Sequence, residues 1–343
     1  MNDSKNLEFI AQPYWSTTAG SLLHLFGIAR AYFKICRRAD VVFIRGMCPH
    51  TAFLYLWATV FRKPICHWIV GDPVAVLRAG ARNGKLQDTL AALYALQDRY
   101  VTRIGRWLTG GALICNGRAL ARVYTSPRTT TTASSTVEEN EFFERADTCQ
   151  GPMVRVLFVG FIRPEKGIEY LLEAVSQLDT KIRWELEIVG PREFPQYCRR
   201  LEEIAATLGI RDRIEWRGYL PNGAPLLERM RAADLLVLPS LSEGTPHVLA
   251  EARANSLPCI ATNVGGIPSC VTDGYDALLV SPKDAPALAK AIERVVSDDE
   301  LRRALIRNGL ASARTQTLDH FISTVLNELI PSQRRKELVA LQQ

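Results

Sequence analysis

Short apolar runs alternate with amphipathic segments along the second half of the chain. Two amphipathic segments, 168–178 and 196–209, repeat apolar residues at helical spacing, and Gly209 is placed to end the second helix. Five apolar runs of strand length lie before, between and after them: 154–160, 184–190, 213–218, 234–240 and 258–262. Strands that alternate with helices predict a parallel sheet covered on both faces, and such sheets bind ligands at the carboxyl ends of their strands.

The first half repeats this pattern less regularly. Helical periodicity covers residues 19–38 and 86–108. Strand-like runs occupy residues 40–46, 64–70 and 111–117. The segment 125–152 is polar and rich in Thr and Ser, so we interpret it as the connection between two domains. We therefore predict an N-terminal domain over 1–150, a C-terminal domain over 151–315 and final helices over 316–343 that pack back toward the N-terminal domain.

Composition narrows the class of protein. The 343 residues are 47% hydrophobic and 23% charged, which is typical of a globular protein of about two domains. The most apolar stretch, 51–61, is shorter than the roughly 20 residues that cross a membrane, and the N-terminus lacks the pattern of a signal peptide. Eight scattered cysteines without a C-x-x-C pair argue against a disulfide framework or a zinc site. We expect a cytoplasmic protein, with peripheral contact to the inner face of the membrane as a further expectation.

The net charge of +6 is unevenly distributed. Residues 1–150 hold 18 Lys and Arg against 11 Asp and Glu, a net +7, whereas residues 151–343 hold 24 against 25, a net −1. A basic half favours an anionic partner such as a membrane surface, a phosphorylated lipid or a nucleic acid, and an ordinary solvated surface explains it equally well. Because no nucleic-acid-binding motif is present, we expect no nucleic acid among the partners.

The segment "EGTPHVLAE" carries one glutamate before a predicted helix and another inside it. Thr245 can cap this helix and Pro246 suits its first turn, so that the free amides at its start offer a seat for phosphate. Glu243 would lie on the loop and Glu251 on the helix. Carboxylates beside a phosphate seat are suited to accept hydrogen bonds from hydroxyls, such as those of ribose or a sugar. An isolated pair of glutamates at this spacing would more often be an ordinary surface feature.

Two further loops carry related chemistry. The loop 160–167 holds Arg163 and Lys166 after the first strand of the second half, where two cations can pair with a diphosphate. Gly160 permits close backbone approach there, and Gly167 admits a turn into the next helix. In a third loop, 262–268, Gly265 and Gly266 would let backbone amides approach an anion. A solvated basic loop and a plain turn are the alternative interpretations.

These segments together resemble the nucleotide-sugar domain of glycosyltransferase family 4. The resemblance covers about residues 153 to 300 and rests on motifs in the family's order and spacing: "FVGFIRPEKGIEYLLEAV", "LEIVG", "RIEWRGYLP", "AADLLVLPSLSEGTPHVLAEARANSLPCIATNVGGIP" and "LLVSPKDAPALAKAI". It implies an α/β protein of the GT-B fold, with two Rossmann-like domains whose parallel sheets face a cleft. It also implies a retaining transfer of a sugar from a nucleotide sugar, with neither metal ion nor cofactor.

The resemblance also implies residue roles. Arg163 and Lys166 would hold the diphosphate, Glu243 would contact the donor sugar, and these three residues would form the catalytic group. Glu251 would bind the ribose. The remaining donor-binding positions would be Gly160, Gly244, Thr245, Pro246, His247, Val248, Gly265 and Gly266.

The chain departs from the family pattern in three places. Ser269 stands where the family usually has glutamate. The first half lacks the family's opening strand and Gly-rich loop, so we expect a shortened N-terminal domain. The family's histidine in that half has no clear counterpart; Asp72 is the candidate acceptor-side residue near its place, together with Asn116 further along. Each of these two has an alternative role in stabilising a turn.

The sequence thus predicts a glycosyltransferase of the hexosyltransferase type (EC 2.4). Its donor would be a nucleotide sugar and its acceptor a glycan or a lipid-linked glycan in cell-surface polysaccharide synthesis. Two alternatives remain open: a nucleotide-sugar epimerase, and a non-catalytic remnant that binds the nucleotide sugar without turning it over.

Overall fold

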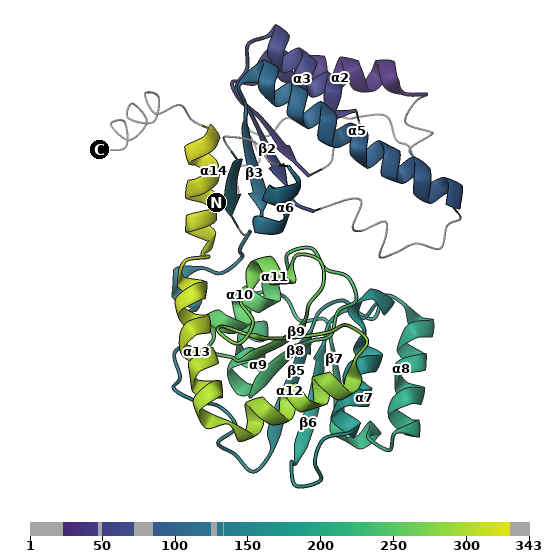
Figure 1. Ribbon diagram of the computed structural model, residues 1–343, viewed down its shortest axis with the longest axis vertical. Helices are drawn as coiled ribbons and strands as arrows, with labels where there is room; N and C mark the ends of the chain where they lie inside the picture. Colours follow the sequence, from purple (N-terminus) through teal and green to yellow (C-terminus); the bar gives the residue numbers. More distant parts are fainter. Residues whose placement is uncertain (1–22, 47–49, 72–84, 125–128, 133, 330–343) are drawn as a thin grey trace. The chain divides into compact units, whose positions relative to one another are not determined.

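The computed structural model describes residues 23–46, 50–71, 85–124, 129–132 and 134–329 (Figure 1). The chain divides into two compact units. The N-terminal unit comprises residues 1–77, 81–131 and 324–343, and the C-terminal unit comprises residues 78–80 and 132–323. Asp72, one of the predicted acceptor-side residues, lies outside the described residues.

The N-terminal unit contains a four-stranded sheet in the order β1-β2-β3-β4. Strands β1, β2 and β3 run parallel, with Val42 opposite Ile65 and Cys66 opposite Ala112. Buried Ile28, Ile44 and Leu54 belong to the core between the sheet and its helices. The elements are α2 (Leu25–Arg38), β1 (Val42–Arg45), α3 (Thr51–Val60), β2 (Ile65–Ile69), α5 (Lys85–Thr109), β3 (Ala112–Asn116), α6 (Arg118–Val123) and β4 (Thr129–Thr132).

The C-terminal unit contains a six-stranded sheet in the order β10-β9-β8-β5-β6-β7, and its paired strands are parallel throughout. Its strands are β5 (Val154–Val159), β6 (Trp184–Val189), β7 (Ile214–Gly218), β8 (Leu235–Leu238), β9 (Cys259–Thr262) and β10 (Leu278–Val280). Its α-helices are α7 (Ile168–Ser176), α8 (Pro195–Thr207), α9 (Ala224–Ala232), α10 (His247–Ala254), α11 (Ile267–Cys270), α12 (Ala285–Ser297) and α13 (Asp299–Arg314), and they are followed by α14 (Leu318–Leu329), of which only the first part belongs to this unit. Short 3-10 turns cover Glu139–Glu141, Pro164–Lys166 and Arg211–Arg213.

The chain order of this second sheet reverses at β5. The strands that follow β5 first extend the sheet on one side as β6 and β7, and the later strands β8, β9 and β10 extend it on the other. The loops after β5 and β8 therefore leave the sheet in opposite directions. Open parallel sheets bind ligands at such a reversal, beyond the carboxyl ends of the strands.

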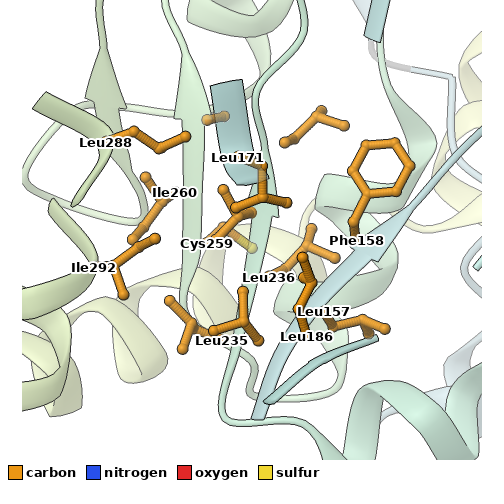
Figure 2. Packing of buried hydrophobic residues seen from close by; sticks show 14 of the residues in the cluster. Leu157, Phe158, Leu171, Leu186, Leu235, Leu236, Cys259, Ile260, Leu288 and Ile292 are labelled. Carbon is orange, nitrogen blue, oxygen red and sulfur yellow. The ribbon is translucent and has the colours of Figure 1, made fainter. Parts of the chain in front are cut away.

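The core of the C-terminal unit lies between this sheet and its helices. Leu157, Leu236 and Ile260 from three neighbouring strands are completely buried. Leu288 and Ile292 of α12 lie beside Ile260 of β9, as Figure 2 shows. Each such side chain removed from water contributes on the order of 1.5–3 kcal/mol, so the core fixes the strands whose ends carry the loops.

The boundary between the units falls between Thr131 and Thr132, ahead of the position near residue 150 that the polar composition suggested. Residues 134–150 are held by the C-terminal unit through buried polar contacts. Arg145 donates to the carbonyls of Arg231 and Ala233, each at 2.8 Å, and Asp147 pairs with Arg302 at 2.6 Å. A polar stretch that looks like a linker is thus a structural strap whose polar groups are satisfied by hydrogen bonds.

The last described helix, α14, spans the division between the units, because residues from Thr324 onward are grouped with the N-terminal unit. Within that unit, the Thr130 hydroxyl donates to the Glu328 carboxylate at 2.5 Å. We keep as a proposal the prediction that the final helices form a segment returning to the N-terminal domain.

Candidate functional site

The loop after β9 packs directly against the loop after β8. A Cβ at Gly265 would lie 1.9 Å from the Glu243 carbonyl oxygen, and a Cβ at Gly266 would lie 2.0 Å from the Gly244 oxygen. The Gly266 amide donates to the Glu243 oxygen at 3.1 Å, and Gly265 has a φ of +54°. Glycine is thus required for the close approach of these two loops. The sequence predicted that backbone amides at these glycines approach an anion, whereas the close approach that the structure shows is to the loop after β8.

The loop after β5 packs on the same β8 loop from the other side. The Leu241 amide donates to the Glu165 oxygen at 2.8 Å. Gly167 has a φ of +61°, and a Cβ on it would lie 2.4 Å from the Pro239 oxygen. Three loops at the carboxyl ends of β5, β8 and β9 are therefore held together by backbone contacts, at the place where the strand order reverses.

Lys166 and Glu243 form an ion pair between two of these loops. Lys166 Nζ lies 2.5 Å from Glu243 Oε1, and the Ser240 hydroxyl donates to the same oxygen at 2.8 Å. The side chains are only 17% and 9% exposed, respectively. Sequence reasoning named both residues but missed Ser240, whose only signal was its place at the end of a strand.

Arg163 is directed to a different partner. Its Nε donates to Glu193 Oε2 at 3.0 Å, and its guanidinium carbon lies 4.5 Å from the centre of the Phe161 ring. Glu193 belongs to the loop after β6. The structure therefore brings Lys166 and Glu243 together and holds Arg163 beside the neighbouring loop.

Gly160 lies where the β5 and β6 loops begin. Its amide donates to the Val189 oxygen at 2.9 Å, and a Cβ at Gly190 would lie 1.8 Å from the Gly160 oxygen. The backbone at Gly160 is thus in close contact with the next loop. Lys166 Cε lies 4.0 Å from the position that a Cβ at Gly160 would take.

Helix α10 begins one residue later than the sequence suggested, and Thr245 does not cap it. Pro246 occupies the N-cap position and the cap has no side-chain hydrogen bond, so the predicted Thr245 cap is wrong. Burial raises the pKa of the nearby Cys270 thiol to about 11, and Arg253 and the Thr245 side chain oppose this rise. The first amides of the helix, at His247 and Val248, precede its hydrogen-bonded ladder and remain suited to an anion.

Glu251 lies just over one turn into α10 and is hydrogen-bonded to residues after β4. Thr136 donates to Glu251 Oε1 at 2.5 Å. Burial raises the pKa of the Glu251 carboxyl, while the Thr136 bond and the nearby His247 lower it. His247 Nε2 lies 3.3 Å from the Ser134 hydroxyl. Ser134 and Thr136 were missed because their Ser- and Thr-rich segment looked like a connection between domains.

Asn116 is buried at the end of β3 in the N-terminal unit. His67, on the neighbouring strand β2, has a structural role. Its Nε2 donates to the Gly46 oxygen at 2.8 Å, its Nδ1 accepts from the Tyr55 hydroxyl at 3.1 Å, and burial lowers its pKa to about 4. The imidazole is therefore neutral near pH 7 and satisfied within the core.

Chemically, the loops of the C-terminal unit and helix α10 together provide a cation, a helix start and two carboxylates. This set can bind phosphate and accept hydrogen bonds from hydroxyls. Among the described residues, no three His, Cys, Asp or Glu side chains gather as a group that could hold a metal ion. In the same described part of the chain, no helix has the length and apolar character needed to cross a membrane.

Comparison with known families identifies this region. Residues 145–311 match the family model described as glycosyl transferases group 1. The matched region of the chain is therefore a group 1 glycosyltransferase domain. The family resemblance inferred from the sequence motifs is thus confirmed.

Among proteins similar in sequence, an uncharacterized glycosyltransferase of Methanocaldococcus jannaschii is 31% identical over 171 residues, covering 50% of this chain and 43% of that protein. The alpha-D-kanosaminyltransferase of Streptomyces kanamyceticus is 32% identical over 45% of this chain and 39% of its own length. A D-inositol 3-phosphate glycosyltransferase of Geodermatophilus obscurus is 36% identical over 50% of this chain and 39% of its own length. The chain spans less than half the length of these curated relatives.

Solved structures confirm the fold. Anabaena HepE in complex with UDP superposes with a TM-score of 0.68 at 16% identity, covering 90% of this chain and 84% of that chain. Sucrose-phosphate synthase from Thermosynechococcus elongatus gives 0.68 at 21% identity, covering 97% and 82%. The protein is therefore an α/β protein with two parallel sheets of four and six strands, and its fold is GT-B, as the sequence predicted.

Proposed function

We propose that this group 1 glycosyltransferase transfers a sugar from a nucleotide-diphosphate donor, with retention at the anomeric carbon. The observation that carries the proposal is the Lys166–Glu243 ion pair, which lies at the reversal of the strand order beside the start of α10. A cation, a row of helix amides and two carboxylates match the three parts of such a donor: diphosphate, sugar and ribose.

In this proposal the positively charged groups and the helix amides bind the diphosphate. Lys166 Nζ would exchange its contact with Glu243 for a phosphate oxygen, assisted by the amides at Gly244 to Val248. Arg163 would leave Glu193 to approach the same phosphates, and the backbone at Gly160 would line their path. Charged hydrogen bonds in a shielded site stabilise the negative charge that develops on a departing diphosphate.

The two carboxylates accept hydrogen bonds from hydroxyl groups of the donor. Glu243, on the loop, would accept hydrogen bonds from the donor sugar, and Glu251, on α10, would accept them from the ribose. Thr136 occupies one oxygen of Glu251 and so leaves the second oxygen for a ligand hydroxyl. Gly265 and Gly266 would support this arrangement by keeping the β8 loop in place.

The transfer itself breaks the bond between the anomeric carbon and the diphosphate oxygen and forms a bond from that carbon to an acceptor oxygen. The acceptor proton passes to the departing phosphate oxygen, so the step needs no separate protein base. Charge grows on the diphosphate as the bond breaks, and Lys166 with the α10 amides is placed to stabilise it.

For the substrates, we propose a uridine diphosphate sugar and a glycan or lipid-linked acceptor of cell-surface polysaccharide synthesis, used at an anionic membrane face. The donor proposal is supported by structural neighbours from Anabaena that were solved with UDP and with UDP-glucose. The acceptor proposal is supported by the neighbour WaaG, a glycosyltransferase involved in lipopolysaccharide biosynthesis, which has a TM-score of 0.62. Asn116, and Asp72 outside the described residues, stay proposals for the acceptor side.

An activity assay separates the candidate functions. The full chain is incubated with UDP-sugars, with and without a lipid extract as acceptor source, and the released UDP and the fate of the sugar are followed. We expect UDP release that depends on the extract and is lost in Glu243→Gln, while Lys181→Gln, a change at an exposed position, retains it. UDP release with an altered free sugar and no acceptor would indicate an epimerase. Binding of UDP without any turnover would indicate a non-catalytic remnant.

A further inference from the structure

Helix α5 of the N-terminal unit exposes a continuous apolar stripe. The stripe residues follow one another at intervals of three or four, which places them on one face of the helix, and each side chain is 44 to 82% exposed. They are Leu93, Leu96, Tyr100, Ile104 and Trp107. Single exposed apolar residues are ordinary, but a stripe along four turns of one helix indicates a surface that contacts something apolar.

The opposite face of α5 is fixed in the unit, so the helix cannot rotate to bury the stripe. A Cβ at Gly105 would lie 2.2 Å from the Tyr55 ring of α3, and Asp98 and Thr102 are buried. Figure 1 shows α3 beside one end of α5, which extends well beyond it. Helix α3 also carries the exposed apolar residues Leu56 and Val60, both about half exposed.

A pocket lined by arginines adjoins the stripe. Its volume is about 270 Å³, and its wall includes Arg99, Arg103 and Arg106 together with the stripe residues Leu96 and Tyr100. Arg106 is oriented by its Nε, which donates to the Gly111 oxygen at 2.9 Å. Such a pocket has the size and charge for a phosphate group, and it opens beside an apolar surface.

The charge of the whole unit agrees with that of the pocket. The N-terminal unit holds 19 Lys and Arg against 8 Asp and Glu, a net +11, whereas the C-terminal unit holds 23 against 28, a net −5. The difference in net charge between the two units is thus larger than the difference between residues 1–150 and 151–343. A surface of net +11 attracts a polyanion and repels a second copy of itself.

We propose that α5 docks on an anionic lipid surface, with its apolar stripe in the boundary between headgroups and acyl chains and a lipid phosphate in the arginine pocket. Aromatic residues with a basic flank are typical of helices that lie in this boundary. A nucleic acid would match the charge but not the stripe. This inference rests on the proposed function, because docking would bring the enzyme to an acceptor at the membrane. Docking itself does not require the donor site, so the two can be measured separately.

The test is co-sedimentation of the full chain with vesicles of phosphatidylcholine alone or with phosphatidylglycerol added. We expect binding to the anionic vesicles at low salt that weakens as salt is raised. The variant Tyr100→Ser/Trp107→Ser should bind at least ten-fold more weakly, because it removes two exposed apolar groups. Arg103→Gln should cost about five-fold, the effect of one cation near an anionic surface.

Matched controls lie in the C-terminal unit. Tyr219→Ser/Tyr275→Ser removes two comparably exposed tyrosines, and Lys181→Gln removes one exposed cation; both should bind like the unaltered chain. UDP titration of every variant reports the donor site independently, so a failed donor site and failed docking are distinguishable. Unaltered vesicle binding in Tyr100→Ser/Trp107→Ser, no vesicle binding by the unaltered chain, or a dimer that this double variant abolishes would each overturn the proposal.

Discussion

The two units treat buried charge in opposite ways. In the C-terminal unit, the buried Arg253 guanidinium lies 2.8 Å from the Asp276 carboxylate, and Arg302 lies 2.6 Å from Asp147. In the N-terminal unit, the buried Asp98 accepts one bond from the Thr51 hydroxyl at 3.4 Å, and its Oδ2 has no hydrogen-bonding partner among the described residues. The C-terminal unit is thus a rigid platform for loops, whereas the N-terminal unit contains a titratable group whose ionisation opposes folding.

The largest effect should come from breaking a pair in the C-terminal unit. Arg253→Met leaves Asp276 buried without its cation, which costs about 3–5 kcal/mol of unfolding free energy. Urea unfolding of the full chain measures it. Arg155→Met is the control, because it breaks the exposed pair with Glu185 and should cost at most about 1 kcal/mol. Equal effects of the two changes would contradict the account of the platform.

The second largest loss of stability should come from disturbing the loop packing at the candidate site. Gly265→Ala and Gly274→Ala both place a side chain at positive φ, but only the first meets backbone, at 1.9 Å from the Glu243 oxygen. Both should lose about 1–2 kcal/mol from the left-handed conformation, and Gly265→Ala should lose about 1–3 kcal/mol more from the clash. Thermal unfolding gives the stabilities, and UDP titration should show weakened binding in Gly265→Ala alone. Identical behaviour of the two variants would show that the close approach does not hold the loop.

In the N-terminal unit, replacing the buried Asp98 by asparagine should stabilise the folded protein. Burial raises the pKa of Asp98 to about 6 from an ordinary value of 3.8, whereas the Thr51 bond lowers it. Between about pH 4 and pH 6 the folded chain keeps a proton that the unfolded chain loses, so stability falls as pH rises and the full cost remains above pH 6. Asp98→Asn should therefore add about 1–3 kcal/mol at pH 7.5 and little at pH 4.

Urea unfolding of Asp98→Asn at several pH values checks this prediction. Asp212→Asn makes the same change at an exposed position of the C-terminal unit and should leave the pH dependence unaltered. A loss of stability in Asp98→Asn at pH 7.5 would mean that the ionised carboxylate is needed in the core.

The smallest effect concerns Thr136. Thr136→Val removes the hydrogen bond that lowers the pKa of Glu251, so this pKa should rise further. Because the proposed ribose contact needs a carboxylate, the loss of UDP affinity on acidification should begin at higher pH, with at most a few-fold change near pH 8. UDP titrations from pH 5 to pH 8 would show this shift. If UDP affinity fell at the same acidic pH in Thr136→Val as in the unaltered chain, Thr136 would have no influence on UDP binding through Glu251.

Most elements of both sheets could be predicted from the sequence because periodicity reports burial. The runs 154–160 and 64–70, for example, became β5 and β2. The motifs at the ends of parallel strands indicated that Lys166 and Glu243 belong to one site, but they did not predict the ion pair between the two side chains. The positions of Ser134 and Thr136 could not be predicted, because a polar segment packed on a domain has the same local composition as a linker. The two are distinguished only by the distant carbonyls and carboxylates that accept hydrogen bonds from the packed segment. Thr245 was misassigned as the cap because α10 begins one residue later, with Pro246 at its N-cap position.

The central claim is that the loops of the C-terminal unit bind a nucleoside diphosphate. Calorimetric titration of UDP into the full chain, Lys166→Ala, Glu251→Ala and the exposed control Lys181→Ala tests it most directly. We predict that the chain and the control bind alike and that each site variant binds on the order of ten- to a hundred-fold more weakly, the loss of about 1.4–2.7 kcal/mol. Equal UDP affinity in all four proteins would contradict the assignment of the site.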